Sequence, residues 1–292
     1  MILAAGLTPA WQQILSFDCL TTGEVNRARD SLWCSSGKVL NVGAALHHLQ
    51  AASLTLCPIG GSTGEQIKDD FNRRGIAARW LPITASTRVC TTLLDEATGV
   101  TTELVENSSP LTELELNQYI DAFAEEARVA QMVVLSGSLP KQTPHDFYRK
   151  LLNQTTAAAI MDVRGRELVE CLPLRPLLVK PNREELAMTV GRPLETESAV
   201  IDAMAEVRKL GAQWVIVSGG PDPLLVLGPS GLERITPPSV RVVNPIGCGD
   251  SLTAAIAAKI LSGSAPLDAI RFGVEYAARK AAMLYPVLAA EK

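Results

Sequence analysis

The strongest constraint on the fold is an alternation along the chain of short apolar runs, rich in β-branched residues, with longer amphipathic stretches. The pattern predicts parallel strands joined by crossover helices, which is an α/β fold. Thr112 and Glu115 form a capping box at one predicted helix start, and 199–210 has apolar residues at helical spacing before Gly211. The apolar runs lie at 53–61, 130–138, 157–163, 177–182 and 213–220.

Two regions depart from this rhythm, at about 10–36 and 86–108. The second has strand-like alternation on both sides of a turn at 97–99, which predicts a β-hairpin. Ligands of open α/β sheets bind beyond the carboxyl ends of the strands. We therefore expect both regions to form a small sheet that serves as a lid over that crevice.

Composition excludes several classes of protein. The 292 residues are 47% hydrophobic with a net charge of -4, and no charged block predicts a nucleic-acid or membrane surface. The six cysteines lack CxxC spacing and the three histidines lack metal-ligand spacing, so we expect reduced thiols and no structural zinc. No signal peptide or membrane span is predicted. The sequence thus predicts one cytoplasmic domain over 1–292.

The segment PIGCGDS at 245–251 carries the clearest chemical signal. It lies between a predicted strand, VRVV at 240–243, and a predicted helix that begins near Ser251. Backbone amides at a glycine-rich helix start can hold a phosphate, and Asp250 beside them could accept a proton during phosphoryl transfer. The alternative is a simple N-cap, with Asp250 capping the helix after a glycine turn.

Further motifs make the chain similar to the ribokinase/PfkB family of carbohydrate kinases. They are NPIGCGDS at 244–251, GKVLN at 37–41, PIGGSTGE at 58–65 and LVKPNREEL at 178–186. The resemblance implies a three-layer αβα core with a small β-sheet lid, and often a homodimer formed through that lid. The branch of 1-phosphofructokinase and tagatose-6-phosphate kinase is most similar, through GEVNRAR at 23–29 and TRVCTTL at 87–93. That branch implies ATP- and Mg²⁺-dependent phosphorylation of a sugar phosphate.

The resemblance also implies roles for individual residues. Asp250 matches the catalytic base. The other matches fall into three groups: the anion hole, Gly247, Cys248 and Gly249; the ATP site, Lys180, Asn182, Glu185, Ser218 and Gly220; and the acceptor site, Gln12, Gly37, Lys38, Asn41, Arg88 and Ser138. Glu185 would act on Mg²⁺ through water. Lys38 and Arg88 would hold the phosphate that the acceptor already carries.

Departures from the family pattern concentrate on the acceptor side. Gln12 replaces an aspartate, Val39 replaces a glycine where bulk would meet a ligand, and Ser36, Cys90 and Thr92 are also unusual. Near the expected adenine pocket the chain has Tyr276, Arg279 and Lys280, and Pro223 replaces a glycine of the nucleotide turn. These changes predict an acceptor that differs from the common phosphosugars of the family, and they do not determine which nucleotide is the donor.

Two alternatives remain from the sequence. One is a sugar- or nucleotide-binding regulator of the same fold with weak or no turnover. The other is a serine hydrolase, because residues 60–64 read GxSxG with Ser62 as the nucleophile. The only histidine after Ser62 is His145, which lies too early in the chain for that fold.

Overall fold

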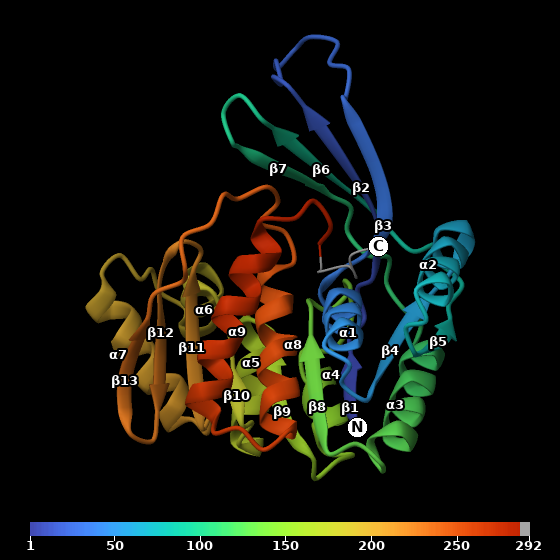
Figure 1. Ribbon diagram of the computed structural model, residues 1–292. Coiled ribbons are helices and arrows are strands. Elements are labelled where there is room, and N and C mark those ends of the chain that lie inside the picture. Colours follow the sequence, from blue (N-terminus) through green and yellow to red (C-terminus); the bar gives the residue numbers. More distant parts are fainter. Residues whose placement is uncertain (287–292) are drawn as a thin grey trace.

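A nine-stranded sheet forms the centre of the computed structural model, which describes residues 1–286 (Figure 1). The strands from β11 to β5 in the spatial order are parallel, whereas β12 and β13 continue the sheet antiparallel at one edge. The spatial order is β13 (Gly231–Ile235), β12 (Asp222–Gly228), β11 (Trp214–Gly219), β10 (Leu178–Val179), β9 (Ala158–Asp162), β8 (Met132–Ser136), β1 (Ile2–Ala5), β4 (Ser53–Ile59) and β5 (Ala78–Pro82).

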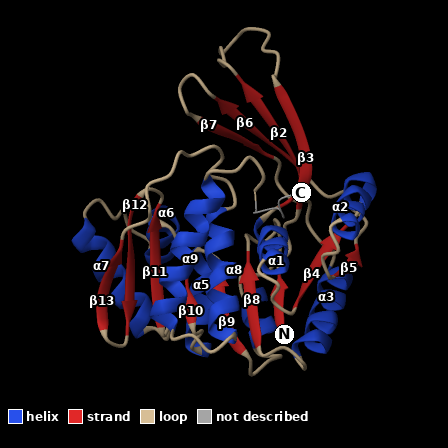
Figure 2. Ribbon diagram, in the orientation of Figure 1, coloured by secondary structure: helices blue, strands red, loops and turns tan. Residues whose placement is uncertain are grey.

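A separate four-stranded sheet stands above the carboxyl ends of the parallel strands (Figure 2). Its order is β3 (Asp30–Ser36), β2 (Ala10–Phe17), β6 (Val89–Asp95) and β7 (Thr101–Val105). These strands come from the two regions that depart from the α/β rhythm. The β6–β7 hairpin turns where the sequence predicts, with Cys90 opposite Val105 at its base.

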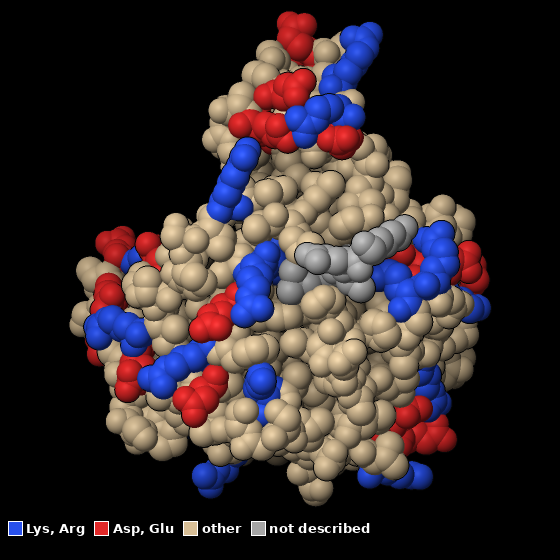
Figure 3. Space-filling model, viewed as in Figure 1, with Lys and Arg blue, Asp and Glu red and all other residues tan. Residues whose placement is uncertain are grey.

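Charges of both signs are mixed over the face of the molecule seen in Figure 3, and a largely uncharged band separates the tip of the small sheet from the main body. Within residues 1–286, no helix is both long enough and apolar enough to cross a lipid bilayer. All six cysteines are free thiols.

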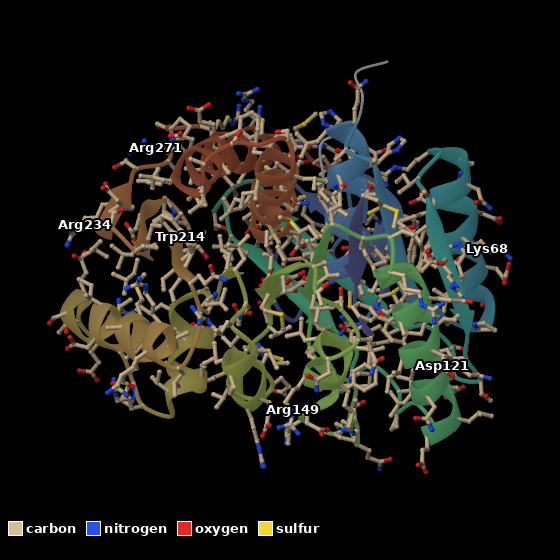
Figure 4. The ribbon with its side chains drawn as sticks, turned by 90° about the horizontal axis from the view of Figure 1, so that it is seen from below. Lys68, Asp121, Arg149, Trp214, Arg234 and Arg271 are labelled. Carbon is tan, nitrogen blue, oxygen red and sulfur yellow. The ribbon has the colours of Figure 1, made fainter. Side chains whose placement is uncertain are left out.

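Helices cover the main sheet in two layers, one on each face (Figure 4). Along β1 the side chains alternate, so that Ile2 and Ala4 pack with one layer while Leu3 and Ala5 pack with the other. This two-sided burial explains why the parallel strands read as continuous apolar runs. One layer holds α1 (Lys38–His48), α2 (Gly61–Arg73), α8 (Cys248–Leu261) and α9 (Pro266–Ala281); the other holds α3 (Glu113–Ala127), α4 (Phe147–Leu152), α5 (Gly165–Cys171), the 3₁₀ turn η1 (Leu172–Leu174), α6 (Arg183–Val190) and α7 (Glu197–Lys209).

Most of the predicted elements are confirmed. The five apolar runs become β4, β8, β9, β10 and β11, and 199–210 lies within and just beyond α7. The capping box of α3 is present, with the Glu115 amide donating to the Thr112 hydroxyl at 3.2 Å.

The predicted strand at 240–243 is wrong, because this segment lies in a loop. Its β-branched residues imitate a strand, but the loop docks on the end of α9, where the amides of Val243 and Asn244 both donate to Ala281 O. Val242 and Val243 are exposed. The sequence pattern predicts only parallel strands in this sheet, whereas β12 and β13 pair antiparallel at one edge.

Candidate active site

Asp250 lies in the first turn of α8 and is only 6% exposed. Its Oδ2 accepts a hydrogen bond from Asn41 Nδ2 at 2.7 Å. Burial raises the pKa of Asp250 to about 6; the Asp162 charge adds to the rise, whereas Lys38, the Asn41 hydrogen bond and Lys180 oppose it. Asp250 is therefore buried, ionised at neutral pH and poised near the pH at which a general base works best.

The glycine turn before Asp250 has the backbone of an anion site. Gly247 is the N-cap of α8 with φ +83°, and no side chain caps this helix, so Asp250 is not an N-cap. The amides of the first helical turn have no partner inside a helix. The Cys248 amide donates to Pro245 O at 3.3 Å, so Gly249 and Asp250 offer the freer amides. The helix dipole adds positive potential at this end.

Two lysines and two carboxylates surround the turn. Lys38 Nζ lies 2.9 Å from Asp162 Oδ1 and 3.0 Å from Glu185 Oε1, and Lys180 Nζ lies 3.2 Å from Asp162 Oδ2. A Cβ on Gly249 would lie 3.3 Å from Lys180 Nζ, so this ammonium borders the turn. The two lysines thus supply positive charge beside Asp250.

Asp162 is a site residue that the sequence reasoning missed. It ends β9, is 1% exposed, and has its pKa lowered by Lys180 and Lys38 in spite of its burial. The available signal was a lone carboxylate at the carboxyl end of an apolar run, where ligands of α/β sheets bind.

The residues assigned to the nucleotide lie at neighbouring strand ends. Asn182 follows β10 and caps α6, and it pairs with Ser218 at the end of β11. Gly220 follows β11 with φ +66° and is exposed. Lys180 connects this group to the turn before Asp250, so the structure brings the five predicted nucleotide residues to one edge of the sheet.

Five of the six predicted acceptor residues line a cavity of about 310 Å³ between the small sheet and the turn. Gln12 Nε2 donates to Thr92 Oγ1 at 2.7 Å. Arg88 donates to the backbone oxygens of Thr8, Pro9 and Glu106. Residues lining the cavity include Gln12, Ser36, Gly37, Lys38, Asn41, Arg88, Cys90, Glu103, Ile246, Gly247, Gly249 and Asp250. Glu103 was missed by the sequence reasoning and brings an exposed carboxylate from β7.

Three expectations for this side can be compared with where the structure places the residues. Lys38 Nζ donates to Asp162 and Glu185 and also borders the cavity, so one of its three N–H groups is left for an acceptor phosphate. Ser138 is exposed and is not among the residues that line the cavity. Val39 is 1% exposed in the first turn of α1 and packs into the core, so it adds no bulk to the cavity.

The three unusual residues of α9 lie in different surroundings. The Tyr276 hydroxyl lies 3.0 Å from His48 Nδ1 on α1, and Arg279 pairs with Glu275 at 3.8 Å on the surface. Lys280 is fully buried.

The structure gives the serine-hydrolase alternative no support. Ser62 lies at the start of α2, in one helix layer, whereas His145 contacts Glu167 of α5 in the other layer at 3.0 Å. The main sheet separates the two residues.

The described residues contain no group of three or more His, Cys, Asp or Glu side chains able to hold a metal ion. Mg²⁺ bound with a nucleotide needs few protein ligands, because phosphates and water supply most of them. Glu185 fits a contact through water: Oε1 accepts from Lys38 and Oε2 accepts from the Asn182 amide, which leaves a second lone pair on each oxygen.

Sugar kinases are among the known proteins that are similar to this chain in sequence and fold. Over 278 residues the chain is 29% identical to 1-phosphofructokinase of Bacillus subtilis, covering 94% of this chain and 90% of that protein. Phosphofructokinase-2 from Escherichia coli in complex with fructose-6-phosphate has a TM-score of 0.86 at 26% identity, covering 96% and 94% of the two chains.

A possible 1-phosphofructokinase from Thermotoga maritima has a TM-score of 0.90 at 19% identity, covering 99% and 94%, and supports the fold. The sequence model described as pfkB family carbohydrate kinase matches residues 14–282. This match covers most of the chain and includes the buried Asp250 and its glycine turn, and it shows that the chain belongs to the pfkB family of carbohydrate kinases.

Proposed function

We propose that this protein transfers the γ-phosphoryl group of ATP to a hydroxyl of a sugar phosphate. The observation that carries the proposal is the buried carboxylate of Asp250, placed between a bare amide turn and a cavity that is lined by polar groups. The relatives support the substrate class, because they are a 1-phosphofructokinase and a phosphofructokinase that binds fructose-6-phosphate.

In the proposed reaction the acceptor hydroxyl binds at Asp250. Its oxygen attacks the γ-phosphorus, the bond to the β–γ bridging oxygen breaks, ADP leaves, and the hydroxyl proton passes to Asp250. Charge on the transferring group is stabilised by the amides of the turn 247–249 and by the ammonium of Lys180. Asn41 orients the Asp250 carboxylate through its hydrogen bond.

The nucleotide would lie along the ends of β10 and β11, against Lys180, Asn182, Ser218 and Gly220. Mg²⁺ would be held by the phosphates with Glu185 acting through water, and when bound it neutralises phosphate charge. Lys38 would keep Asp162 and Glu185 in place beside the phosphates, because it hydrogen-bonds both carboxylates.

Gln12, Gly37, Asn41, Arg88 and Glu103 would form the acceptor site. Three of the Arg88 N–H groups hold backbone oxygens of 8–9 and 106, so the guanidinium is fixed with donors left for a phosphate. The exposed carboxylate of Glu103 can accept hydrogen bonds from sugar hydroxyls. In the family an aspartate at the position of Gln12 does this.

The small sheet would also serve as a lid and as the contact between two copies of the chain. One row of paired residues crosses the strands on the face opposite the cavity: Trp33, Gln13, Thr91 and Leu104. This row is offset by one residue from the row that lines the cavity, so its side chains point the other way. Trp33 and Leu104 are 43% and 55% exposed on this outward face. A second small sheet could cover these side chains.

The test is ADP release from MgATP with fructose 1-phosphate, fructose 6-phosphate, tagatose 6-phosphate and the corresponding free sugars. We expect turnover with at least one phosphorylated ketose and much less with its free sugar. Asp250→Asn is the control, and its kcat should fall roughly 10²- to 10⁴-fold. Ligand binding by calorimetry without turnover would instead support the regulator alternative.

A further inference from the structure

Lys280 is a buried charge that the proposed reaction does not use. It lies on α9 with 0% of its side chain surface exposed. Its Nζ donates to Asn244 O at 2.7 Å and also to Ile246 O. Both acceptors are neutral backbone carbonyls, and no ion pair within residues 1–286 includes Lys280.

Such a burial is costly, since an ammonium loses its hydration and gains no carboxylate in exchange. Burial lowers the pKa of Lys280 to about 8, although Cys248 and Asp250 oppose the shift. A lysine held under these conditions needs a compensating role, and its two contacts indicate where that role lies.

The contacts are made one to three residues before Gly247, the N-cap of the anion turn. No sheet fixes this segment, because 240–243 is a loop. Asn244 is fully buried, and its Nδ2 donates to Leu284 O at 2.7 Å. Lys280 therefore provides the last attachment of the segment to α9 before the chain turns into α8.

We propose that Lys280 is a positioning residue whose ammonium serves as a built-in cation for the carbonyls of Asn244 and Ile246. By holding these oxygens together, it aims the amides of 247–249 at the transferring phosphoryl group. The inference rests on the proposed function. Two carbonyls that converge on one buried point would also accept a small monovalent cation, so removal of the ammonium should create a site for one.

The experiment compares Lys280→Met with Lys209→Met, a control on the exposed end of α7. Each protein is assayed at constant ionic strength in choline, sodium, potassium, ammonium or methylammonium chloride. In choline we expect kcat of Lys280→Met to fall roughly 10²-fold, the scale of losing one anion-hole donor, with KM for both substrates changed less than about threefold.

Ammonium or potassium should raise the kcat of Lys280→Met at least about tenfold above its value in choline, whereas sodium should raise it less. Wild type and Lys209→Met should have equal kcat in all five salts. A lysine needed only for folding would give a loss that no cation reverses, and that result would overturn the proposal. So would a kcat of Lys280→Met close to that of wild type.

If Lys280→Met does not fold in choline, the wild-type assay decides: a requirement for potassium or ammonium contradicts a built-in cation, and full activity in choline supports it. Wild-type turnover in the same plate reports on the proposed function separately. If wild type releases no ADP with any sugar, the readout becomes the melting temperature of Lys280→Met, which ammonium should raise and choline should not.

Discussion

Asp250 combines burial with ionisation because its neighbours have opposing effects on its pKa. Since the base must be deprotonated, kcat/KM of wild type should fall as the pH drops through about 6. Asn41 donates to the ionised form, so Asn41→Ala should raise the pKa of Asp250 and move the acid limb to higher pH. Asn117→Ala, an exposed change on α3, is the control. An acid limb that stays in place in Asn41→Ala would contradict this electrostatic role.

The same shift predicts that Asp250 costs stability. Its pKa is about 6 in the folded chain against 3.8 as the usual value. The folded state thus disfavours the charged form, and the cost is absent below the unfolded pKa and complete above the folded one. Asp250→Asn should raise the free energy of unfolding by about 1–3 kcal/mol at about pH 8 and by much less at about pH 4. Urea unfolding at both pH values checks it; an equal gain at both would show that another effect dominates.

Substitutions of the two glycines in the turn into α8 test backbone strain and phosphate contact separately. A Cβ on Gly247 would lie 2.0 Å from Pro286 O at φ +83°, so Gly247→Ala should lose several kcal/mol of stability as well as activity. Gly99 also has a positive φ, +70°, but a Cβ there would have no other atom within 4 Å. Gly99→Ala therefore measures the cost of the backbone dihedral alone, about 1–2 kcal/mol.

Gly249 has no positive φ, and its Cβ would meet only Lys180 Nζ. Gly249→Ala should therefore fold with nearly unchanged stability but lose about 10–10³-fold in kcat, because the methyl group lies where the phosphoryl group must approach. Melting curves and ADP release distinguish the variants. A fully active Gly249→Ala would place the phosphoryl group elsewhere.

Strand β2 allows a matched test of the acceptor cavity. Gln12 faces the cavity and donates to the buried Thr92 hydroxyl, while Gln13 points to the opposite face. An aspartate at position 12 has no N–H group to donate to Thr92, and it adds a negative charge near Asp250 and Glu103. We expect Gln12→Asp to raise KM for the sugar phosphate about tenfold, and Gln13→Asp to leave KM unchanged. A lower KM in Gln12→Asp would mean that the pocket still suits the family's aspartate.

How far the sequence predicts this structure depends on whether a signal is local. The apolar runs, the capping box and the hairpin depend on nearby residues, and all are confirmed. The order of strands, the docking of 240–246 on α9 and the pairing of Lys38 with Asp162 join residues far apart in the chain. Lys38 begins α1 and Asp162 ends β9, and a single sequence does not determine that the two side chains meet. Asp250 and its turn were predictable because one contiguous motif contains them.

The proposed dimer gives the outward face of the small sheet a function. Leu104 is 55% exposed there and contributes little to the fold of one copy, so Leu104→Asp should leave the melting temperature nearly unchanged. Buried between two copies, the same carboxylate would weaken association by at least about 10²-fold. Val129→Asp is the control, because Val129 is 67% exposed just beyond the end of α3 on the main body. Sedimentation velocity should give a dimer for wild type and Val129→Asp and a monomer for Leu104→Asp. A wild-type monomer would contradict the dimer itself. A dimer in all three proteins would show that the copies do not meet through this face.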